Sequence, residues 1–169
     1  MIKGDLDEKG CVHAFETVLG NADAGTGLFT LKTLNLAHND LPSGAIVKIL
    51  NTFKAASLEG LTLSGNVLEE NVDLVAAFYR HKPSLKYLSL ANCYVAEGIL
   101  AAVVCGLISS TRATSSKKTT VLKEIDLRGN VVEGQVVSIL SAALSSKSNP
   151  LFAAYMGSGI SKTGKQLCC

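Results

Sequence analysis

Tryptophan is missing from this 169-residue chain, and aromatic residues make up only 5% of it. Few aromatic rings leave little material for a surface on which nucleic-acid bases stack. A strong excess of one charge is also missing, because the formal net charge is +2. A balance so close to neutral does not attract nucleic acid or an anionic membrane by bulk electrostatics. We therefore expect no nucleic-acid partner.

Signals for export are scarce as well. The first ten residues, MIKGDLDEKG, contain no apolar core of a signal peptide, and no Asn-x-Ser/Thr glycosylation site occurs. The five cysteines are odd in number and show no disulfide framework. The most apolar run, residues 98–108, is about half the ~20 residues that a membrane-spanning helix needs. These features predict a cytoplasmic protein.

Catalytic and metal-binding motifs do not occur in the sequence. The histidines, His13, His38 and His81, are far apart and do not combine with cysteine or carboxylate at metal-ligand spacing, so we predict all three at the surface. Residues 159–166, GISKTGKQ, are similar to a phosphate-binding loop, but Gln166 replaces its Ser/Thr and too few residues follow for a helix. We expect no enzyme activity, metal, cofactor or small-molecule substrate.

One stretch of the chain, LKTLNLAHNDL at 31–41, recurs three more times. The other copies are 58–68, 85–95 and 122–132. The ninth position of each copy, which we call the marker, holds Asn39, Asn66, Cys93 and Asn130. The markers follow one another at steps of 27, 27 and 37 residues. A recurring period of this length is typical of stacked structural repeats.

Four positions of every copy are aliphatic, and they form four columns in the alignment. The columns are Leu31, Leu58, Leu85 and Leu122; Leu34, Leu61, Leu88 and Ile125; Leu36, Leu63, Leu90 and Leu127; and Leu41, Leu68, Val95 and Val132. The pattern L-x-x-L-x-L-x-x-N/C-x-L resembles the leucine-rich repeat family, and the steps of 27 are similar to its ribonuclease-inhibitor-like subfamily. The resemblance implies an α/β solenoid, a short curved horseshoe with a parallel sheet on the concave face and helices on the convex face. It also implies that the marker side chains bond backbone groups of the neighbouring turn as an asparagine ladder.

Each copy predicts a short strand followed by a helix. Alternation within the strand points Leu34 and Leu36 inward and Asn35 outward. Apolar residues at helical spacing then predict returning helices with apolar positions in 45–53, 99–108 and 136–144. For the second helix we predict Asn71 as the N-cap and an apolar face of Val72, Val75, Ala76 and Tyr79.

We expect one domain over residues 1–169. Its parts are an N-terminal cap helix and loop (1–27, with the helix at 5–19), four repeats (28–150), a degenerate fifth repeat (151–161) and a mobile tail (162–169). In the fifth repeat, Leu151, Ala154 and Met156 match the template. The longest step contains a polar insertion at 109–120, which we expect to be an exposed loop, either without a role or in contact with a partner.

A repeat protein without catalytic motifs is best explained as a non-enzymatic scaffold for a protein partner. We expect binding through the concave sheet face and the edge loops, with charge concentrated at the fourth repeat. The candidate partner-binding residues are Asn35, Thr62, Tyr87, Ser89, Glu124, Asp126, Arg128 and Tyr155. Ribonuclease inhibitor acts through a strongly acidic surface, which this slightly basic chain does not share, so ribonuclease binding is not implied.

Two alternatives remain within the same family. Ran GTPase-activating proteins use this repeat subfamily, although with more repeats and an acidic tail, which suggests a regulator of a small GTPase. A short capped stack is also similar to the repeat domain of tropomodulin-type actin-capping proteins, which suggests a cytoskeletal module. Separately, Cys168 and Cys169 end the chain either as free thiols or as a lipidation site that would tether the protein to a membrane.

Overall fold

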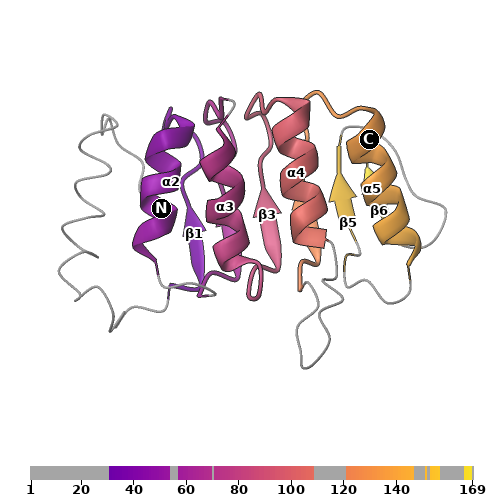
Figure 1. Cartoon of the computed structure of the whole chain (residues 1–169), viewed down its shortest axis with the longest axis horizontal. Helices are drawn as coiled ribbons and strands as arrows, with labels where there is room; N and C mark the ends of the chain where they lie inside the picture. The colour runs from indigo at the N-terminus through magenta and orange to yellow at the C-terminus, as the bar shows by residue number, and fades with distance from the viewer. Residues whose placement is uncertain are drawn as a thin grey trace.

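The structure is a computed structural model, and it describes residues 31–53, 57–69, 71–108, 121–146, 151, 153–156 and 166–168. These residues form an α/β fold in which strands and helices alternate along the chain (Figure 1). The strands are β1 (Thr33–Asn35), β2 (Gly60–Thr62), β3 (Tyr87–Ser89), β4 (Glu124–Asp126), β5 (Ala153–Tyr155) and β6 (Gln166–Cys168). The helices are α2 (Ser43–Thr52), α3 (Val72–His81), α4 (Glu97–Ile108) and α5 (Gly134–Ser145).

All six strands belong to one parallel sheet, in the order β1-β2-β3-β4-β5-β6. Each strand therefore lies beside the next strand along the chain. Leu34 pairs in register with Leu61, then Leu88, then Ile125, which is one column of the sequence alignment. The register confirms the predicted alignment of the four copies. The units stack side by side in a solenoid-like arrangement.

The aliphatic columns form the spine of a single core. Every column residue is buried except Leu31 and Val132, which are partly buried and pack against the same core. Burying an aliphatic side chain stabilises a fold by roughly 1.5–3 kcal/mol. One unit alone cannot bury both faces of its own column residues, so neighbouring units depend on one another for stability.

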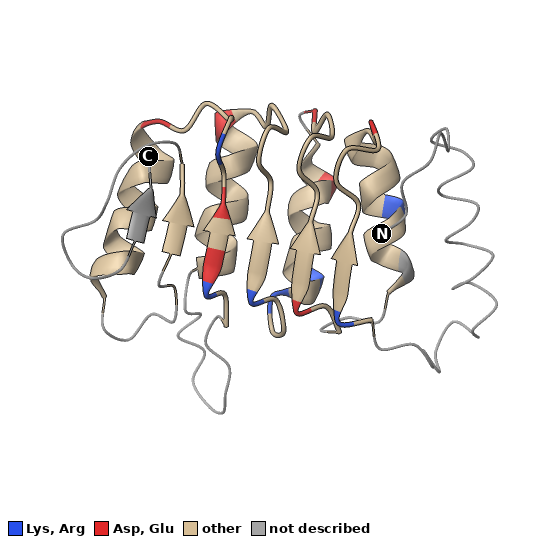
Figure 2. Ribbon diagram, turned by 180° about the vertical axis from the view of Figure 1, so that it is seen from behind, with Lys and Arg blue, Asp and Glu red and all other residues tan. Residues whose placement is uncertain are grey.

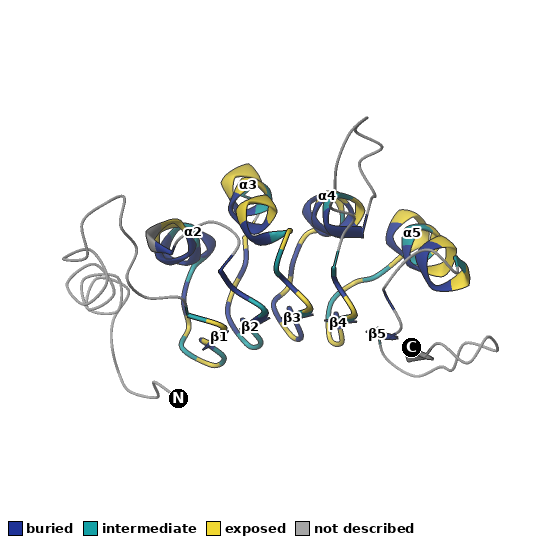
Figure 3. Cartoon of the chain, turned by 90° about the horizontal axis from the view of Figure 1, so that it is seen from below, coloured by how far each residue is buried: buried dark blue, intermediate teal, exposed yellow. Residues whose placement is uncertain are grey.

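The described helices lie on one side of the sheet (Figure 1). Seen end-on, they spread more widely than the strands, so the sheet is on the inner side of a gentle curve (Figure 3). The cause is the difference in width, because helices pack about 8–10 Å apart while parallel strands lie about 4.8 Å apart. The predicted concave position of the sheet follows from this difference.

Helix α3 turns a different face inward from the predicted one. Its N-cap is Asn71 as expected, and the side chain accepts a hydrogen bond from Asp73 N–H at 2.9 Å. The buried residues, however, are Leu74, Ala77, Phe78 and His81. Val72, Ala76 and Tyr79 are exposed and Val75 is partly buried, so the predicted face was wrong. Counted from the marker, the buried stripe of α3 is one residue later than that of α2, which moves every side chain around the helix by about 100°.

His81 was predicted at the surface, and that prediction was also wrong. The side chain is 1% exposed and takes the position in α3 that the buried Phe53 takes after α2. His81 Nε2 lies 3.2 Å from the carbonyl oxygen of Leu50. Because a carbonyl only accepts, Nε2 carries the proton and donates to a last-turn carbonyl of α2. Nδ1 is buried and has no hydrogen-bond partner among the residues that the structure describes.

The turn after each of the first four strands contains a residue in the left-handed conformation. The residue before each marker has a positive φ, namely 56° at His38, 70° at Gly65, 54° at Asn92 and 73° at Gly129. Glycine adopts this conformation without a steric penalty. The His38 side chain lies over Gly65, and the Asn92 side chain lies over Gly129, in the space that a Cβ would fill. The glycines therefore permit both the turn and the close contact between units.

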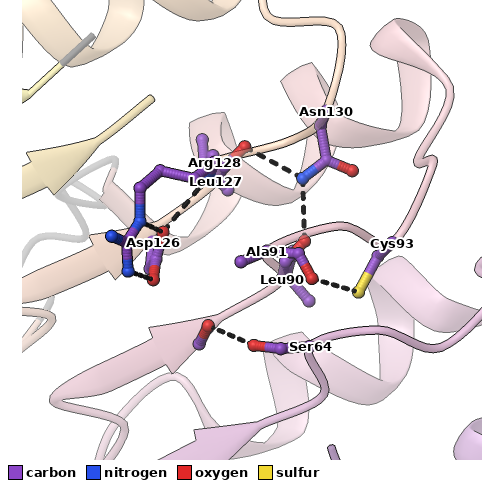
Figure 4. A network of polar contacts seen from close by, with 9 residues as sticks. Ser64, Leu90, Ala91, Cys93, Asp126, Leu127, Arg128 and Asn130 are labelled. Atoms are coloured by element: carbon purple, nitrogen blue, oxygen red, sulfur yellow. Dashed lines mark hydrogen bonds and ion pairs between the residues drawn. The ribbon is translucent and has the colours of Figure 1, made fainter. Parts of the chain in front are cut away.

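The marker side chains of the second, third and fourth units connect each turn to the turn before it. The Asn66 amide nitrogen donates to the carbonyl oxygens of Leu36 at 2.9 Å and Leu63 at 2.6 Å, and its oxygen accepts from Leu41 N–H at 2.9 Å. Asn130 donates in the same way to Leu90 at 2.7 Å and Leu127 at 2.9 Å (Figure 4). Its oxygen accepts from Val95 N–H at 3.1 Å. Cys93 donates to the Leu63 carbonyl at 3.2 Å. Asn39 donates within its own turn, to Leu36 at 2.9 Å and Ala37 at 3.0 Å.

The sheet continues beyond the four clear repeats. In the fifth unit, β5 pairs with β4 so that Ala154 lies opposite Ile125, and Leu151 and Ala154 are fully buried. We predicted a mobile tail at 162–169, and within it β6 pairs in parallel with β5. The physical reason is that an edge strand has unpaired backbone N–H and C=O groups, which a further strand satisfies.

Several predicted features lie outside the described residues. They are the cap helix at 5–19 with its loop, the insertion at 109–120, residues 157–165 and Cys169. In the part of the chain that the structure describes, no helix is both long and apolar enough to cross a membrane.

Candidate functional site

The face of the sheet opposite the helices, which we call the open face, carries the predicted partner-binding residues. Its central row runs across β1 to β5 as Asn35, Thr62, Ser89, Asp126 and Tyr155. The row beside it consists of Thr33, Gly60, Tyr87, Glu124 and Ala153. No helix or strand among the described residues covers this face (Figure 3). Asn35 and Asp126 are three strands apart, roughly 14 Å, so the predicted residues form a band and not one cluster.

Asp126 and Arg128 form an ion pair on the open face. Asp126 Oδ1 accepts hydrogen bonds from Arg128 Nε at 2.9 Å and from Arg128 backbone N–H at 3.2 Å. Asp126 Oδ2 accepts from Arg128 Nη2 at 2.7 Å (Figure 4). This bidentate geometry is the stronger form of an arginine–carboxylate ion pair. Asp126 raises the pKa of the Arg128 guanidinium above its ordinary value, so the side chain stays cationic.

Two tyrosines accompany this ion pair. The Arg128 guanidinium carbon lies 5.6 Å from the centre of the Tyr155 ring, within the range of a cation–π interaction. Asp126 is the main cause of the raised Arg128 pKa, and the phenol groups of Tyr87 and Tyr155 make smaller contributions in the same direction. Tyr87 also lies beside Glu124 in register. Arg128 and Tyr155 are therefore in contact, and Tyr87 lies on β3, the strand next to the one that carries Asp126.

The rest of the open face carries mostly small, uncharged residues. The hydroxyl oxygens of Ser64 and Ser89 are 2.7 Å apart and share a hydrogen bond, and Ser89 is buried. A side chain at Gly60 would press against Thr33, whose Cγ2 would be 3.3 Å from the new Cβ. Asn35 folds back on its own turn and accepts a hydrogen bond from Ala37 N–H at 3.0 Å. Asn35 and Thr62 therefore lie on the open face but away from the Arg128 cluster.

A second surface was missed by the reading of the sequence. At the carboxyl ends of the strands, the residue after the marker is exposed and apolar in three successive units. These residues are Val67, Tyr94 and Val131. They occupy one column of the repeat alignment, directly before the fourth core column. An apolar column outside the core pattern of the alignment could have predicted this surface.

Charge is distributed unevenly between the two ends of the strands (Figure 2). Several carboxylates follow the carboxyl ends of the strands, and we call this edge the carboxyl edge; they are Asp40, Glu69, Glu97 and Glu133. The opposite edge carries Lys32, Lys86 and Lys123, together with Glu59. Glu59 accepts from both Lys32 and Lys86 at 2.6 Å, which lowers its pKa to about 2.

The Cys93 thiol does not have the character of a catalytic one. Cys93 is buried, and burial raises the pKa of its thiol, so it stays protonated and donates its hydrogen bond. No group of three metal-ligating side chains comes together among the residues that the structure describes. The side chains of Cys168 and Cys169 lie outside the description, so their lipidation stays a prediction.

Comparison with models of protein families finds no match for this sequence. Comparison with curated proteins likewise finds no match.

Proposed function

We propose that this chain is a leucine-rich repeat solenoid of the ribonuclease-inhibitor-like type and serves as a cytoplasmic, non-enzymatic scaffold for a protein partner. Three findings support the repeat assignment. The four copies stack in the register of their alignment, the marker side chains bond the preceding turns, and helices cover the outer side of the curve. The proposed docking surface is the open face, centred on Arg128.

The observation that carries this proposal is that Arg128 is exposed and yet held in one orientation by its neighbours. The Arg128 side chain is 58% exposed, yet Asp126 and Tyr155 hold it from two sides. A guanidinium has five N–H donors, and Asp126 engages only Nε and Nη2. The remaining donors are available to a carboxylate or carbonyl group of a partner. Because the side chain is already ordered, binding costs little conformational entropy.

The neighbouring residues suit a protein partner. Tyrosine and arginine are the residue types most often found at the energetic centre of protein interfaces. Small residues on β1 to β3, such as Gly60 and Ser89, would let the backbone of a partner approach the sheet closely. Because the stack is curved, the region around Arg128 and the small residues on β1 to β3 can contact the same convex surface of a partner.

Affinity capture with quantitative mass spectrometry tests the proposal. The open-face variant replaces Arg128 and Tyr155 by alanine, and a matched control replaces Lys48 and Arg80 on the helices. Urea unfolding first establishes that both variants fold like the parent chain. We expect a set of proteins that the parent and the control capture and the open-face variant loses at least about tenfold. Equal capture by all three chains would place the docking surface elsewhere.

A further inference from the structure

Three large apolar side chains are exposed next to one another at the carboxyl edge. The exposed fraction is 48% for Val67, 77% for Tyr94 and 65% for Val131. Scattered exposed apolar residues are ordinary, but a contiguous row of them marks an interaction surface. Whether these three form a row depends on how the units connect.

Backbone hydrogen bonds place them in adjacent turns. Leu68 N–H, directly after Val67, donates to the Cys93 carbonyl at 3.0 Å. Val95 N–H, directly after Tyr94, donates to the Asn130 side chain at 3.1 Å. Each apolar residue is therefore beside the corresponding residue of the next unit. Tyr94 is the middle of the row.

Folding does not account for this row. The residue that follows each member packs in the core, and Leu68 and Val95 are buried. The exposed residues themselves add nothing to that core. Tyr94 also has a φ of 53°, a left-handed conformation that a bulky aromatic residue rarely adopts. A small polar residue would suit such a position better.

The charge around the row has one sign. Asp40 precedes the row in the first unit, Glu69 lies two residues after Val67, and Glu133 lies two residues after Val131. No ion pair joins these carboxylates to another residue in the described part of the chain. The nearest basic residue along the chain is Arg128, which Asp126 neutralises. Glu97 and Glu133 also stabilise the N-terminal ends of α4 and α5, because a negative charge interacts favourably with the helix dipole there. Asp40 and Glu69 lie outside the described helices and have no such role.

We infer that the carboxyl edge, formed by Val67, Tyr94, Val131 and the carboxylates around them, docks a basic amphipathic segment of a protein partner. The apolar side of the segment would cover the row, and its lysines or arginines would face the carboxylates. Nucleic acid does not fit, because its phosphates would meet the acidic rim. The inference rests on the proposed role in protein binding but uses a different surface from the open face.

A defined peptide tests the inference. The probe is a fluorescent helix of about 14 residues, about 21 Å long, with leucines on one side and lysines on the other. We expect reversible binding, measured by fluorescence anisotropy, that weakens as salt rises from about 50 to about 300 mM. Two control peptides, with serine for leucine and with glutamate for lysine, should each bind at least about tenfold more weakly.

Variants of the chain locate the binding. Asparagine suits the left-handed turn, so Tyr94→Asn should fold normally. It should reduce the affinity for the probe at least about tenfold. Glu69→Gln with Glu133→Gln should remove most of the salt dependence. Tyr87→Ser on the open face is the matched control and should leave probe binding unchanged, which separates this inference from the proposed function.

Other outcomes would overturn the inference. Equal binding by the parent and Tyr94→Asn, or by the two charge versions of the peptide, would show that the carboxyl edge does not recognise a basic amphipathic segment. An absence of binding by the parent would have the same meaning while leaving capture through the open face untouched. Self-association in sedimentation that Tyr94→Asn abolishes would make a second copy of the chain the occupant instead.

Discussion

The Asn66 side chain donates a hydrogen bond of 2.9 Å to the carbonyl oxygen of Leu36, one unit earlier in the chain. Asn66 is completely buried, and its amide also bonds Leu63 and Leu41. A single side chain thus satisfies three backbone groups that would otherwise be buried without partners.

Replacement of Asn66 by alanine should destabilise the protein strongly, because these three backbone groups lose their partner. We expect the free energy of unfolding to fall by about 2–4 kcal/mol in urea titrations. Asn51→Ala is the control, since Asn51 is exposed in α2 and its side chain accepts a hydrogen bond from Arg80 at 3.2 Å. It should change stability by less than about 0.5 kcal/mol. Similar losses in both variants would contradict the role of the marker.

Asn66→Cys should be less damaging than Asn66→Ala. The chain itself uses cysteine at the marker of the third unit, where Cys93 donates to Leu63 at 3.2 Å. A thiol replaces one donor but is a weak acceptor for Leu41 N–H. The stability of Asn66→Cys, measured in the same titrations, should therefore lie between those of the parent and the alanine variant.

The unfolding free energy should fall as the pH drops below the ordinary histidine pKa of 6.5, because burial lowers the pKa of His81 in the native state. Between 6.5 and that lowered value, the unfolded chain binds a proton that the folded chain does not, so acid favours unfolding. Above pH 6.5 His81 is neutral in both the folded and the unfolded state, so it does not contribute to the pH dependence of the unfolding free energy. Urea titrations between about pH 7.5 and pH 5 measure the effect.

His81→Leu should flatten this pH dependence, because leucine does not titrate and occupies the corresponding position in α4 and α5. Asn51→Ala removes no titratable group and is the control, so it should leave the dependence unchanged. If His81→Leu kept the full slope of the parent, another group would be responsible.

Two glycines of α4 should respond differently to replacement by alanine. A Cβ at Gly98 meets nothing within 4 Å, so Gly98→Ala should stabilise the protein by about 0.5–1 kcal/mol. A Cβ at Gly106 would collide with the Tyr79 ring, whose hydroxyl donates to the Ala102 carbonyl at 2.9 Å. Gly106→Ala should displace that ring and lose the hydrogen bond, which offsets the gain in helix propensity.

The displacement of Tyr79 has its own readout. Burial raises the pKa of Tyr79 above 10.0, so Gly106→Ala should lower it toward that value. Ultraviolet titration of the phenols, with Tyr79→Phe subtracted as reference, measures the change. An unaltered Tyr79 pKa in Gly106→Ala would show that the ring does not move.

Glu59 should titrate far below an ordinary carboxyl group. Hydrogen bonds from Lys32 and Lys86 lower its pKa from 4.5 to about 2. The stability that this adds is present above 4.5 and is lost as the pH falls toward 2. Replacement of both lysines by glutamine should return the pKa to about 4.5, as read from carboxyl carbon chemical shifts by NMR. A midpoint near 4.5 in the parent would rule out the two ion pairs in solution.

Much of the fold was predictable because the repeats constrain it strongly. A shift of one residue in strand register would turn core residues toward solvent; these residues are Leu34, Leu61, Leu88 and Ile125. The aligned columns are therefore compatible with only one register between neighbouring strands. The open-face positions followed from the same alternation. Helix α3 was harder, because Val72, Val75 and Tyr79 look like an apolar face as convincingly as Leu74 and Phe78 do. A helix has no such register constraint, and one added residue in the preceding turn rotates it.

The sequence by itself determined the repeating unit, the strand register and the outward row from Asn35 to Asp126, because identical units can bury their leucines only by stacking in phase. Tertiary structure alone decided that His81 is buried against Leu50, that Arg128 lies over Tyr155, and that β6 extends the sheet. The physical reason is that each of these depends on atoms of a neighbouring unit. Distances between units are not encoded in the spacing of any one segment.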